Sequence, residues 1–200
     1  TQGKVEGLAL TSVDFDGSDD YINVGDANSF SFGDGSNDSA FSVSAWVKAD
    51  DWTSFPIITK GVYNSTGEWQ FQSFSDDKLY LQLNDESVSS TQEWASTSAV
   101  LTGYQDKWVH VTATYNGVGG TSANAGINLY VNGVAEAMTL GDAGTYVAME
   151  NGSAAVHIGR YDSTYANGSI RDVRIYDYEL SADQVASLYS NTLLQTPQQH

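Results

Sequence analysis

Several aromatic side chains of this sequence stand beside amide and carboxylate side chains, a combination suited to binding sugars. An aromatic ring offers a flat surface to the apolar face of a sugar, while Asn, Asp and Gln form hydrogen bonds with its hydroxyl groups. Tyr161, Asp162, Tyr165 and Asn167 combine both kinds in one segment, YDSTYAN. The other candidate rings are expected at strand ends or in loops, and they are Trp52, Tyr63, Trp69, Trp94 and Tyr146. For each single ring, packing within the fold is the alternative role, but we expect at least one of them to line a binding site.

Acidic and histidine residues show no spacing typical of a catalytic site. Glycoside hydrolysis needs two carboxyl groups that flank the scissile bond, yet the nearest candidate, Glu68, has no acid two or four residues further on. The sequence has neither a serine elbow nor an HExxH motif, the patterns that would indicate acyl transfer or a zinc hydrolase. His110 and His157 are interpreted as strand residues with satisfied hydrogen bonds. We therefore predict a binding protein without catalytic activity.

Alternating apolar residues predict the strands that must position these side chains. Residues 107–133, KWVHVTATYNGVGGTSANAGINLYVNG, contain two arms in which every second side chain is apolar, the period of a β-strand. The Asn-Gly pair at 132–133 accepts positive φ and suits a tight turn after the second arm. Residues 41–48, FSVSAWVK, alternate in the same way, and we assign these strands to the inner layer of a sandwich. Trp46 and Trp108 lie within them and are interpreted as packing residues.

Further short strands and one helix complete the predicted fold. Strands separated by turn residues are expected at 8–24, 55–60, 69–74, 79–83, 156–159 and 169–180. Ser181 and Gln184 have the spacing of a capping box, so a short helix is predicted over Ala182–Tyr189. This spacing of elements is typical of antiparallel sandwiches. The predicted fold class is all-β, with two antiparallel sheets in a jelly-roll sandwich and one short C-terminal helix.

Composition limits the classes of partner. The 200 residues suit one large β domain, expected over residues 1–195, with residues 196–200 as the start of a linker. The formal charge of −17 repels phosphate backbones and anionic lipids, so neither nucleic acid nor a membrane is an expected partner. There are no cysteines, and no apolar run approaches the roughly 20 residues that span a bilayer. A first residue other than Met indicates a piece of a longer protein.

The order of the blocks FDGSDDYINV, FSVSAWVK, KWVHVTATYNG, INLYVNG, AVHIGR and GSIRDVRIYDYELSADQVASLY resembles the laminin-G-like, concanavalin-A-like jelly-roll family. The resemblance covers nearly the whole chain, about residues 8–189. It implies two antiparallel sheets, one of them curved, with binding sites in loops or on the concave face. The pair of carboxylates that glucanases of this scaffold carry on one strand is absent.

The resemblance also implies a calcium site, where the loop after the first strand approaches the last long strand. The matching positions are Asp16, Gly17, Asp19 and Asp20 in the loop and Asp172 in the strand. Calcium takes six to eight oxygen ligands, and these carboxylates would supply several of them. Where the family more often has two acids, this chain has Arg171 before Asp172. The alternative is therefore that the acids cap turns and that Arg171 pairs with one of them.

The leading interpretation is a non-catalytic carbohydrate-binding or adhesion module, dependent on calcium if that site is formed. Its expected partners are a glycan or cell-surface polysaccharide and the neighbouring domains of a larger secreted or cell-surface protein. A charge of −17 favours salt-rich or calcium-rich surroundings outside the cell. The first alternative is a protein-binding or structural spacer domain. A glycoside hydrolase or lyase with unusual catalytic residues is the second.

Overall fold

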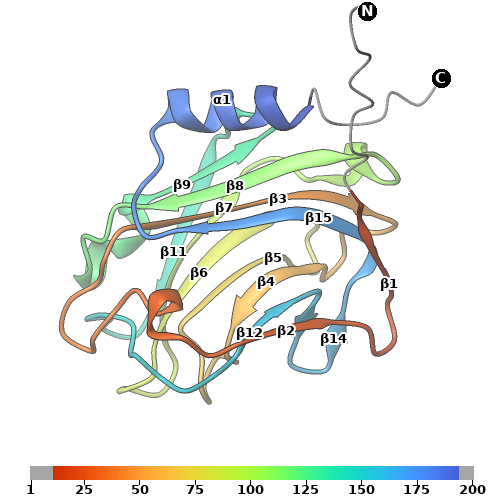
Figure 1. The fold of residues 1–200 in the computed structure, drawn as a ribbon. Coiled ribbons are helices and arrows are strands. Elements are labelled where there is room, and N and C mark those ends of the chain that lie inside the picture. Colours follow the sequence, from red (N-terminus) through yellow and green to blue (C-terminus); the bar gives the residue numbers. More distant parts are fainter. Residues whose placement is uncertain (1–10, 194–200) are drawn as a thin grey trace, which may run out of the picture.

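The computed structural model describes residues 11–193, which form two large antiparallel sheets stacked face to face, with a helix on the outside (Figure 1). The order in the six-stranded sheet is β1 (Val13–Asp16), β15 (Asn167–Tyr176), β3 (Phe41–Ala49), β8 (Val109–Tyr115), β9 (Ile127–Val131) and β10 (Val134–Ala135). The order in the seven-stranded sheet is β11 (Met138–Ala143), β7 (Thr91–Thr97), β6 (Leu79–Asp85), β5 (Trp69–Ser73), β4 (Pro56–Lys60), β12 (Val156–Ile158) and β2 (Ile22–Gly25). The predicted all-β sandwich is confirmed.

Smaller elements join these strands. A two-stranded hairpin, β13 (Arg160–Tyr161) and β14 (Thr164–Tyr165), follows β12 directly and packs against β4. Three 3-10 turns lie in connecting loops: η1 (Asn28–Phe30), η2 (Thr102–Tyr104) and η3 (Gly120–Gly126). The helix α1 (Ala182–Leu193) closes the described chain. It extends beyond the predicted end at Tyr189.

The hairpin of β8 and β9 forms as its alternation predicts. The two strands pair antiparallel with Val111 opposite Val131 and Ala113 opposite Leu129, and all four side chains are buried. Apolar side chains on one face of the hairpin therefore meet the core together. The turn after β9 uses positive φ at Asn132 and Gly133, so the predicted tight turn at 132–133 is also confirmed.

One hydrophobic core lies between the two sheets. Alternate residues of β3 and β8 project into it from the six-stranded sheet, and alternate residues of β5 and β6 from the other. Phe41 and Trp69, from opposite sheets, have ring centroids 5.6 Å apart. A second, smaller cluster of buried residues contains Tyr130, Leu180 and Val185. Residues 1–10 and 194–200, and with them both ends of the predicted domain boundaries, lie outside the described residues.

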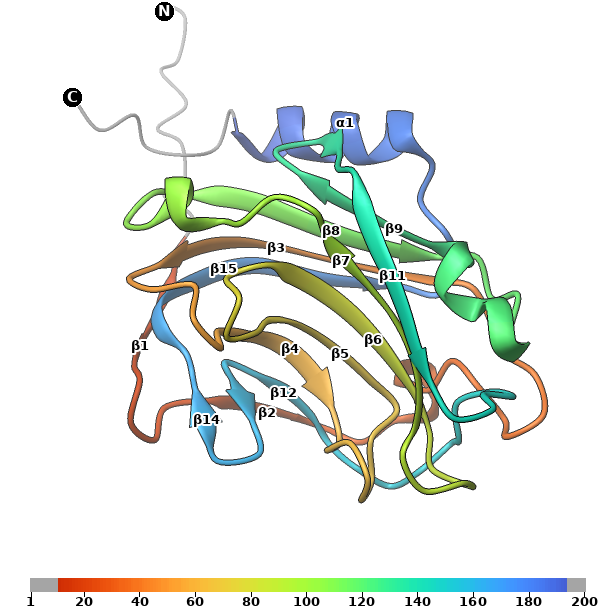
Figure 2. The same cartoon turned by 180° about the vertical axis from the view of Figure 1, so that it is seen from behind.

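The helix α1 covers the outer face of the six-stranded sheet (Figures 1 and 2). Its predicted capping box is present, because Ser181 N donates to Gln184 Oε1 at 2.8 Å and Gln184 N donates to Ser181 Oγ at 3.3 Å. Trp46 Nε1 donates to Thr192 Oγ1 at 2.9 Å and its ring packs against Tyr189. Trp46 is therefore the packing residue that was predicted. Within residues 11–193 no helix combines the length and the apolar character that crossing a membrane requires.

Among the strands that the sequence did not predict, β7 and β11 belong to the seven-stranded sheet. β7 falls within the polar stretch 85–106, and β11 follows the hairpin turn. The side chains that β7 turns toward the core are Thr91, Glu93, Ala95 and Thr97, so the expected row of large apolar residues is missing. Pairing with β6 on one side and β11 on the other defines this strand instead.

Candidate functional site

The outer face of the seven-stranded sheet carries a row of polar and aromatic side chains. Leu79, Leu81 and Leu83 of β6 face the core, so the intervening residues Tyr80 and Gln82 point to the opposite face. The register places Gln70 of β5 opposite Gln82, and Gln82 opposite Trp94 of β7. Three neighbouring strands thus present a glutamine, a glutamine and a tryptophan side by side on one face.

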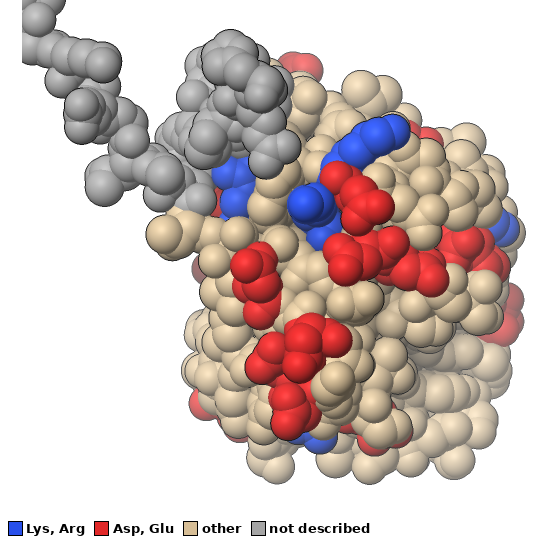
Figure 3. Space-filling view, turned by 90° about the vertical axis from the view of Figure 1, so that its right-hand side faces the viewer, with Lys and Arg blue, Asp and Glu red and all other residues tan. Residues whose placement is uncertain are grey.

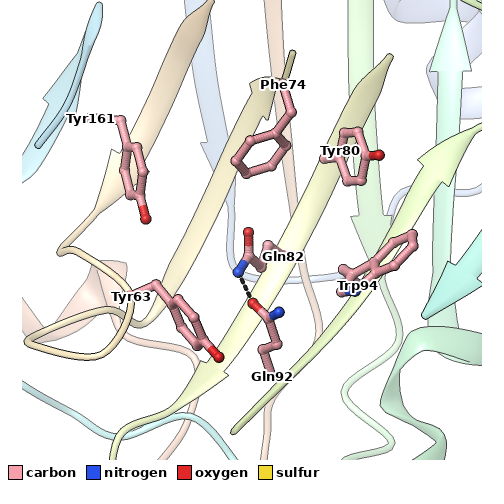
Figure 4. A pocket seen from close by; sticks show the side chains of 7 residues that line it. All are labelled: Tyr63, Phe74, Tyr80, Gln82, Gln92, Trp94 and Tyr161. Atoms are coloured by element: carbon pink, nitrogen blue, oxygen red, sulfur yellow. Dashed lines mark hydrogen bonds between the residues drawn. The ribbon is translucent and has the colours of Figure 1, made fainter. Parts of the chain in front are cut away.

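An aromatic pocket of about 280 Å³ opens on this face (Figure 4). It is lined by Tyr63, Phe74, Tyr80, Gln82, Gln92, Trp94 and Tyr161. Figure 4 shows Tyr63 and Tyr161 on one side, Tyr80 and Trp94 on the other, and the two glutamines between them. The Phe74 and Tyr80 centroids are 4.8 Å apart and those of Tyr80 and Trp94 are 5.5 Å apart. The lining offers ring faces and amide groups, and it includes no charged side chain.

Amide groups supply the hydrogen-bonding capacity of this face. Gln82 Nε2 donates to Gln92 Oε1 and lies 3.3 Å from Asn84 Oδ1. Beside them Gln70 and Gln72 are buried, and within residues 11–193 neither the Gln70 amide nor the Gln72 Nε2 has a hydrogen-bond partner. A buried amide without a partner costs free energy. These groups point to a polar ligand or to ordered water at this face.

Two phenol groups of the pocket, those of Tyr80 and Tyr161, are neutral hydrogen-bonding groups at neutral pH. Burial raises the pKa of Tyr161 above its usual value. Burial also raises the pKa of Tyr80, and the hydrogen bond from its hydroxyl to Asp76 Oδ2, 2.8 Å long, adds to this shift. An uncharged phenol combines an apolar ring with a polar tip, as a sugar-binding pocket requires.

A glycine on the neighbouring strand makes room for the tryptophan. Gly141 of β11 is the register partner of Trp94, and a Cβ at position 141 would overlap the indole ring. The ring therefore lies against the backbone of β11 at Gly141. This close approach fixes the direction in which Trp94 presents its free surface to the pocket.

Three of the predicted ligand-binding rings belong to this pocket, and three belong to the core. Tyr63, Trp94 and Tyr161 line the pocket, although Trp94 lies inside β7 and not in a loop. The prediction for Trp52, Trp69 and Tyr146 is corrected, because each is at most 1% exposed and presents no surface to a ligand. Trp52 packs on Phe55, Trp69 Nε1 donates to the carbonyl of Phe30, and Tyr146 Oη donates to Asp38 Oδ2.

The remaining predicted ligand residues lie outside the aromatic pocket. Asp162 lines a second pocket, and the Tyr165 ring lies beneath the guanidinium of Arg160. Asn167 begins β15 as the register partner of Asp16. Four pocket residues were not singled out in the sequence: Phe74, Tyr80, Gln82 and Gln92. The alternation in LYLQL, residues 79–83, contained the signal for Tyr80 and Gln82, since it separates them from the leucines of the core.

The acidic loop after β1 brings three of the predicted calcium ligands together. Carboxylate oxygens of Asp16, Asp19 and Asp20 lie within 4.8 Å of one another, and all three side chains are exposed. The chain turns at Gly17 with φ +77°, and Asp16 Oδ1 accepts a hydrogen bond from Ser18 N at 2.8 Å. Figure 3 shows separate groups of acidic side chains on the face that includes β1. Clustered carboxylates on a tight turn fit the oxygen ligands that calcium prefers.

Asp172 does not join this cluster. Asp16 pairs with Asn167 at the start of β15, whereas Asp172 lies at a register shift further along that strand. Its carboxylate accepts bonds from Arg174 Nε at 2.9 Å and Nη2 at 3.2 Å. Arg171 lies against the rings of Trp46 and Trp108 instead of pairing with the loop acids. Both the predicted role of Asp172 and the alternative pairing of Arg171 are therefore corrected.

The other titratable candidates are structural. Glu68 is 1% exposed, and its Oε1 accepts from Lys60 Nζ at 3.1 Å and from Gly152 N at 3.0 Å. His110 and His157 lie in β8 and β12, as predicted. Burial lowers the pKa of His110 to about 4. The expectation of satisfied hydrogen bonds is corrected for His110, because its Nδ1 has no partner within residues 11–193.

The curved sheet, its aromatic pocket and the opposing covered sheet define a lectin-like β-sandwich. The chain belongs to the concanavalin A-like lectin/glucanase superfamily, because the Laminin_G_3 family model matches residues 16–186. A comparison with curated proteins gives no match.

Solved structures with this fold include domains of enzymes and toxins. Domain 4 of AbnA, an extracellular GH43 arabinanase from Geobacillus stearothermophilus solved with arabinotriose, is 18% identical, with a TM-score of 0.59 over 93% of this chain and 84% of that chain. The botulinum neurotoxin serotype D ligand-binding domain, solved with N-acetylneuraminic acid, is 21% identical, with a TM-score of 0.59 over 89% and 41%. The serotype G binding domain is 19% identical, with a TM-score of 0.61 over 93% and 45%. This chain thus spans less than half of the toxin domains, and the similarity shows a shared fold.

Proposed function

We propose that this protein is a carbohydrate-binding module that holds a sugar ring in the aromatic pocket. The observation that carries the proposal is the lining of the pocket, in which five aromatic rings surround Gln82 and Gln92 without a charged group. The apolar face of a pyranose or furanose would stack on Trp94 or Tyr161, and its hydroxyls would exchange hydrogen bonds with the glutamine amides. Sugar binding by two proteins of the same fold supports this function.

The proposed module binds without catalysis. Hydrolysis of a glycosidic bond in the usual way needs two carboxyl groups on either side of that bond, whereas no carboxylate is among the residues that line the aromatic pocket. Glu68 faces Lys60 in the interior instead. We infer a place in a larger secreted or cell-surface protein, where the module would attach its neighbouring domains to a polysaccharide. The matched domain of an extracellular arabinanase supports this setting.

We propose a calcium ion at the loop after β1 as a stabilising element. Asp16, Asp19 and Asp20 would hold the ion, with backbone carbonyls and water as further ligands. Their carboxylates lie within 4.8 Å of one another and repel each other unless a cation or salt screens them. The calcium would supply that positive charge and keep the turn at Gly17 closed.

The sugar proposal is tested by screening the protein against arrayed glycans and soluble polysaccharides by affinity electrophoresis. Trp94→Ala removes the main ring face and is expected to weaken binding about fivefold or more, since truncation of a buried aromatic anchor commonly costs more than about 1 kcal/mol. Tyr178→Ala is the matched control, because Tyr178 is a large exposed ring outside the aromatic pocket. Equal binding by Trp94→Ala and the unchanged protein, or no binding to any glycan, would overturn the proposal.

A further inference from the structure

A second pocket, here called the arginine pocket, lies beside the aromatic pocket. It has a volume of about 230 Å³, and Thr59, His157, Arg160 and Asp162 are among its lining residues. The two pockets adjoin along the chain, because Val62 and Arg160 line the arginine pocket while their chain neighbours Tyr63 and Tyr161 line the aromatic one. A short oligosaccharide that fills one pocket would therefore reach the other.

The guanidinium of Arg160 is held in a fixed orientation. Its central carbon lies 4.7 Å from the ring centroid of Tyr21 and 5.6 Å from that of Tyr165. Nε donates to the carbonyl oxygen of Asp162 at 2.8 Å, and Thr59 Oγ1 donates to the Arg160 carbonyl at 2.8 Å, which anchors the strand. The fork of an arginine held in this way is prepared to bind a planar anion through two parallel hydrogen bonds.

Two donor groups of this arginine lack a partner within the described chain. Within residues 11–193, Nε is the only guanidinium nitrogen of Arg160 that donates a hydrogen bond. No carboxylate oxygen of these residues lies within 4.0 Å of the guanidinium nitrogens, the distance that defines an ion pair. Among the other described basic residues, Lys60, Lys78 and Arg174 have such a carboxylate, whereas Lys48, Lys107 and Arg171 do not; of the four without one, only Arg160 lines this pocket. Asp162 lines the same pocket, yet Arg160 forms no ion pair with it. In a protein with 25 acidic and 8 basic residues, the two Nη groups of Arg160 therefore stay available to an anion from outside.

The surrounding groups are compatible with an anion. His157 packs its ring edge against Tyr21 with centroids 5.1 Å apart. Burial, and then the charge of Arg160, lower the pKa of His157, so it is a neutral hydrogen-bonding group at pH 7. Asp162 is exposed, and its Oδ2 accepts from Ser163 Oγ at 3.4 Å. The overall negative charge acts weakly here, because salt screens charges beyond about 8 Å under physiological conditions.

We propose that the arginine pocket binds the carboxylate or sulfate group of an acidic sugar, next to a neutral sugar in the aromatic pocket. The inference rests on the proposed carbohydrate-binding function and names its ligand class, a glycan with anionic substituents. The Nη atoms of Arg160 would contact the anion, while His157 and Thr59 border the adjoining ring. The aromatic pocket alone gives no preference for charge, so Arg160 would set the selectivity.

The test is an NMR titration of the protein with D-glucuronate, D-glucose 6-sulfate and D-glucose. The Arg160 Nε–H signal reports the arginine pocket, the Trp94 Nε1–H signal reports the aromatic pocket, and the ring signals of His157 report the charge beside them. At least one anionic sugar is expected to shift the Arg160 signal saturably, with a Kd roughly tenfold or more below that for glucose. A response to glucuronate alone, to the sulfate alone or to both identifies the source of the anion. A bound anion should also raise the pKa of His157, because it offsets the charge of Arg160.

Variants separate this inference from the proposed function. Arg160→Gln should remove the preference for anionic sugars and keep the Trp94 response to neutral sugars. Arg160→Lys keeps the positive charge but loses the paired N–H donors of the guanidinium. It should therefore show a preference for anionic sugars between those of the unchanged protein and Arg160→Gln. Lys107→Gln removes an exposed positive charge outside both pockets and should change nothing.

The two ideas fail in different ways. A Trp94 shift without a saturable Arg160 shift would overturn the inference and leave the proposed function standing. An unchanged preference in Arg160→Gln would overturn the inference as well. The absence of any Trp94 response to sugars, together with a blank polysaccharide screen, would count against the proposed function itself.

Discussion

Lys60 and Glu68 form an ion pair from which solvent is excluded, with Nζ 3.1 Å from Oε1 and side-chain exposures of 0% and 1%. Lys60 Nζ also contacts Asp26 Oδ1 and the carbonyl of Ala154, each at 2.7 Å. Burial raises the pKa of Glu68, and the charge of Lys60 opposes that shift. This group of contacts fastens the chain before β5 to β4 and to the loop before β12.

Glu68→Gln is therefore expected to destabilise the fold without affecting sugar binding. Removing one member of a buried pair commonly costs 3–5 kcal/mol, and the loss here should be about 2 kcal/mol because Asp26 and the Ala154 carbonyl remain with Lys60. Urea unfolding gives the change in free energy, and the exposed Glu179→Gln is the control. Loss of an enzymatic activity in a Glu68→Gln protein of unchanged stability would contradict this structural role.

Gly141→Ala should weaken sugar binding although position 141 touches no ligand. The added methyl group would overlap the indole of Trp94 and turn the ring away from its place in the pocket. We expect at least a fivefold loss of affinity, about 1 kcal/mol, measured by calorimetry with a glycan identified in the screen. Gly103→Ala is the matched control, because a Cβ there meets nothing within 4 Å. Equal affinities for both variants would show that the orientation of Trp94 is unimportant.

His110 should make the fold sensitive to acid. Its pKa is lowered from 6.5 to about 4 by burial, so the unfolded chain takes up the proton first as the pH falls. Stability is complete above pH 6.5 and is lost between pH 6.5 and 4, by about 3 kcal/mol in total. Buried carboxyl groups with a raised pKa, such as Asp38, shift stability in the opposite sense, so a difference measurement is needed.

The comparison with His110→Gln isolates this effect. Chemical unfolding at several pH values should show the unchanged protein losing about 3 kcal/mol more than the variant between pH 7 and 4. His157→Gln is the control, because His157 is half-buried and should give a smaller difference. Parallel stability curves for the unchanged protein and His110→Gln would refute the assignment.

Calcium is expected to raise the melting temperature through the loop after β1. An ion that binds only the folded state at a hundred times its Kd adds about 2.7 kcal/mol. Asp19→Asn should remove most of this shift between calcium and EDTA, since Asp19 belongs to the three-carboxylate group. Asp172→Asn should leave it unchanged, because that carboxylate binds Arg174. A full shift in Asp19→Asn would place the ion elsewhere.

The sequence predicted the fold better than the site. Alternation of large apolar residues marked the hairpin of β8 and β9, because burial of one face governs both the pattern and the pairing. β7 escaped detection because small and polar residues fill its inner face, among them Ala95 and Glu93. Without that strand, Trp94 could be named as a candidate but not placed on a sheet.

Some of the rings predicted to bind a ligand line the pocket and others are buried in the core. Long-range contacts, which the sequence does not reveal, decide between these two positions. Trp69 and Tyr146 reach the interior because a distant group accepts their polar hydrogen, the carbonyl of Phe30 and the carboxylate of Asp38. Asp172 was misplaced because the register of β1 on β15 puts Asn167, not Asp172, opposite Asp16. Strand register and long-range hydrogen bonds are properties of the assembled sheets.

The alternation along β5, β6 and β7 divides each strand into two independent sets of side chains. Odd-numbered residues such as Leu81 hold the sandwich together, while even-numbered ones such as Gln82 face outward. If the protein binds glycans as proposed, exchange of the outward set would alter which glycan it binds and leave the hydrophobic core unchanged. A library randomised at Gln70, Gln82 and Trp94 should therefore yield many folded proteins that differ in sugar-binding specificity. The outer face of this sheet is thus a suitable scaffold for the design of new lectins.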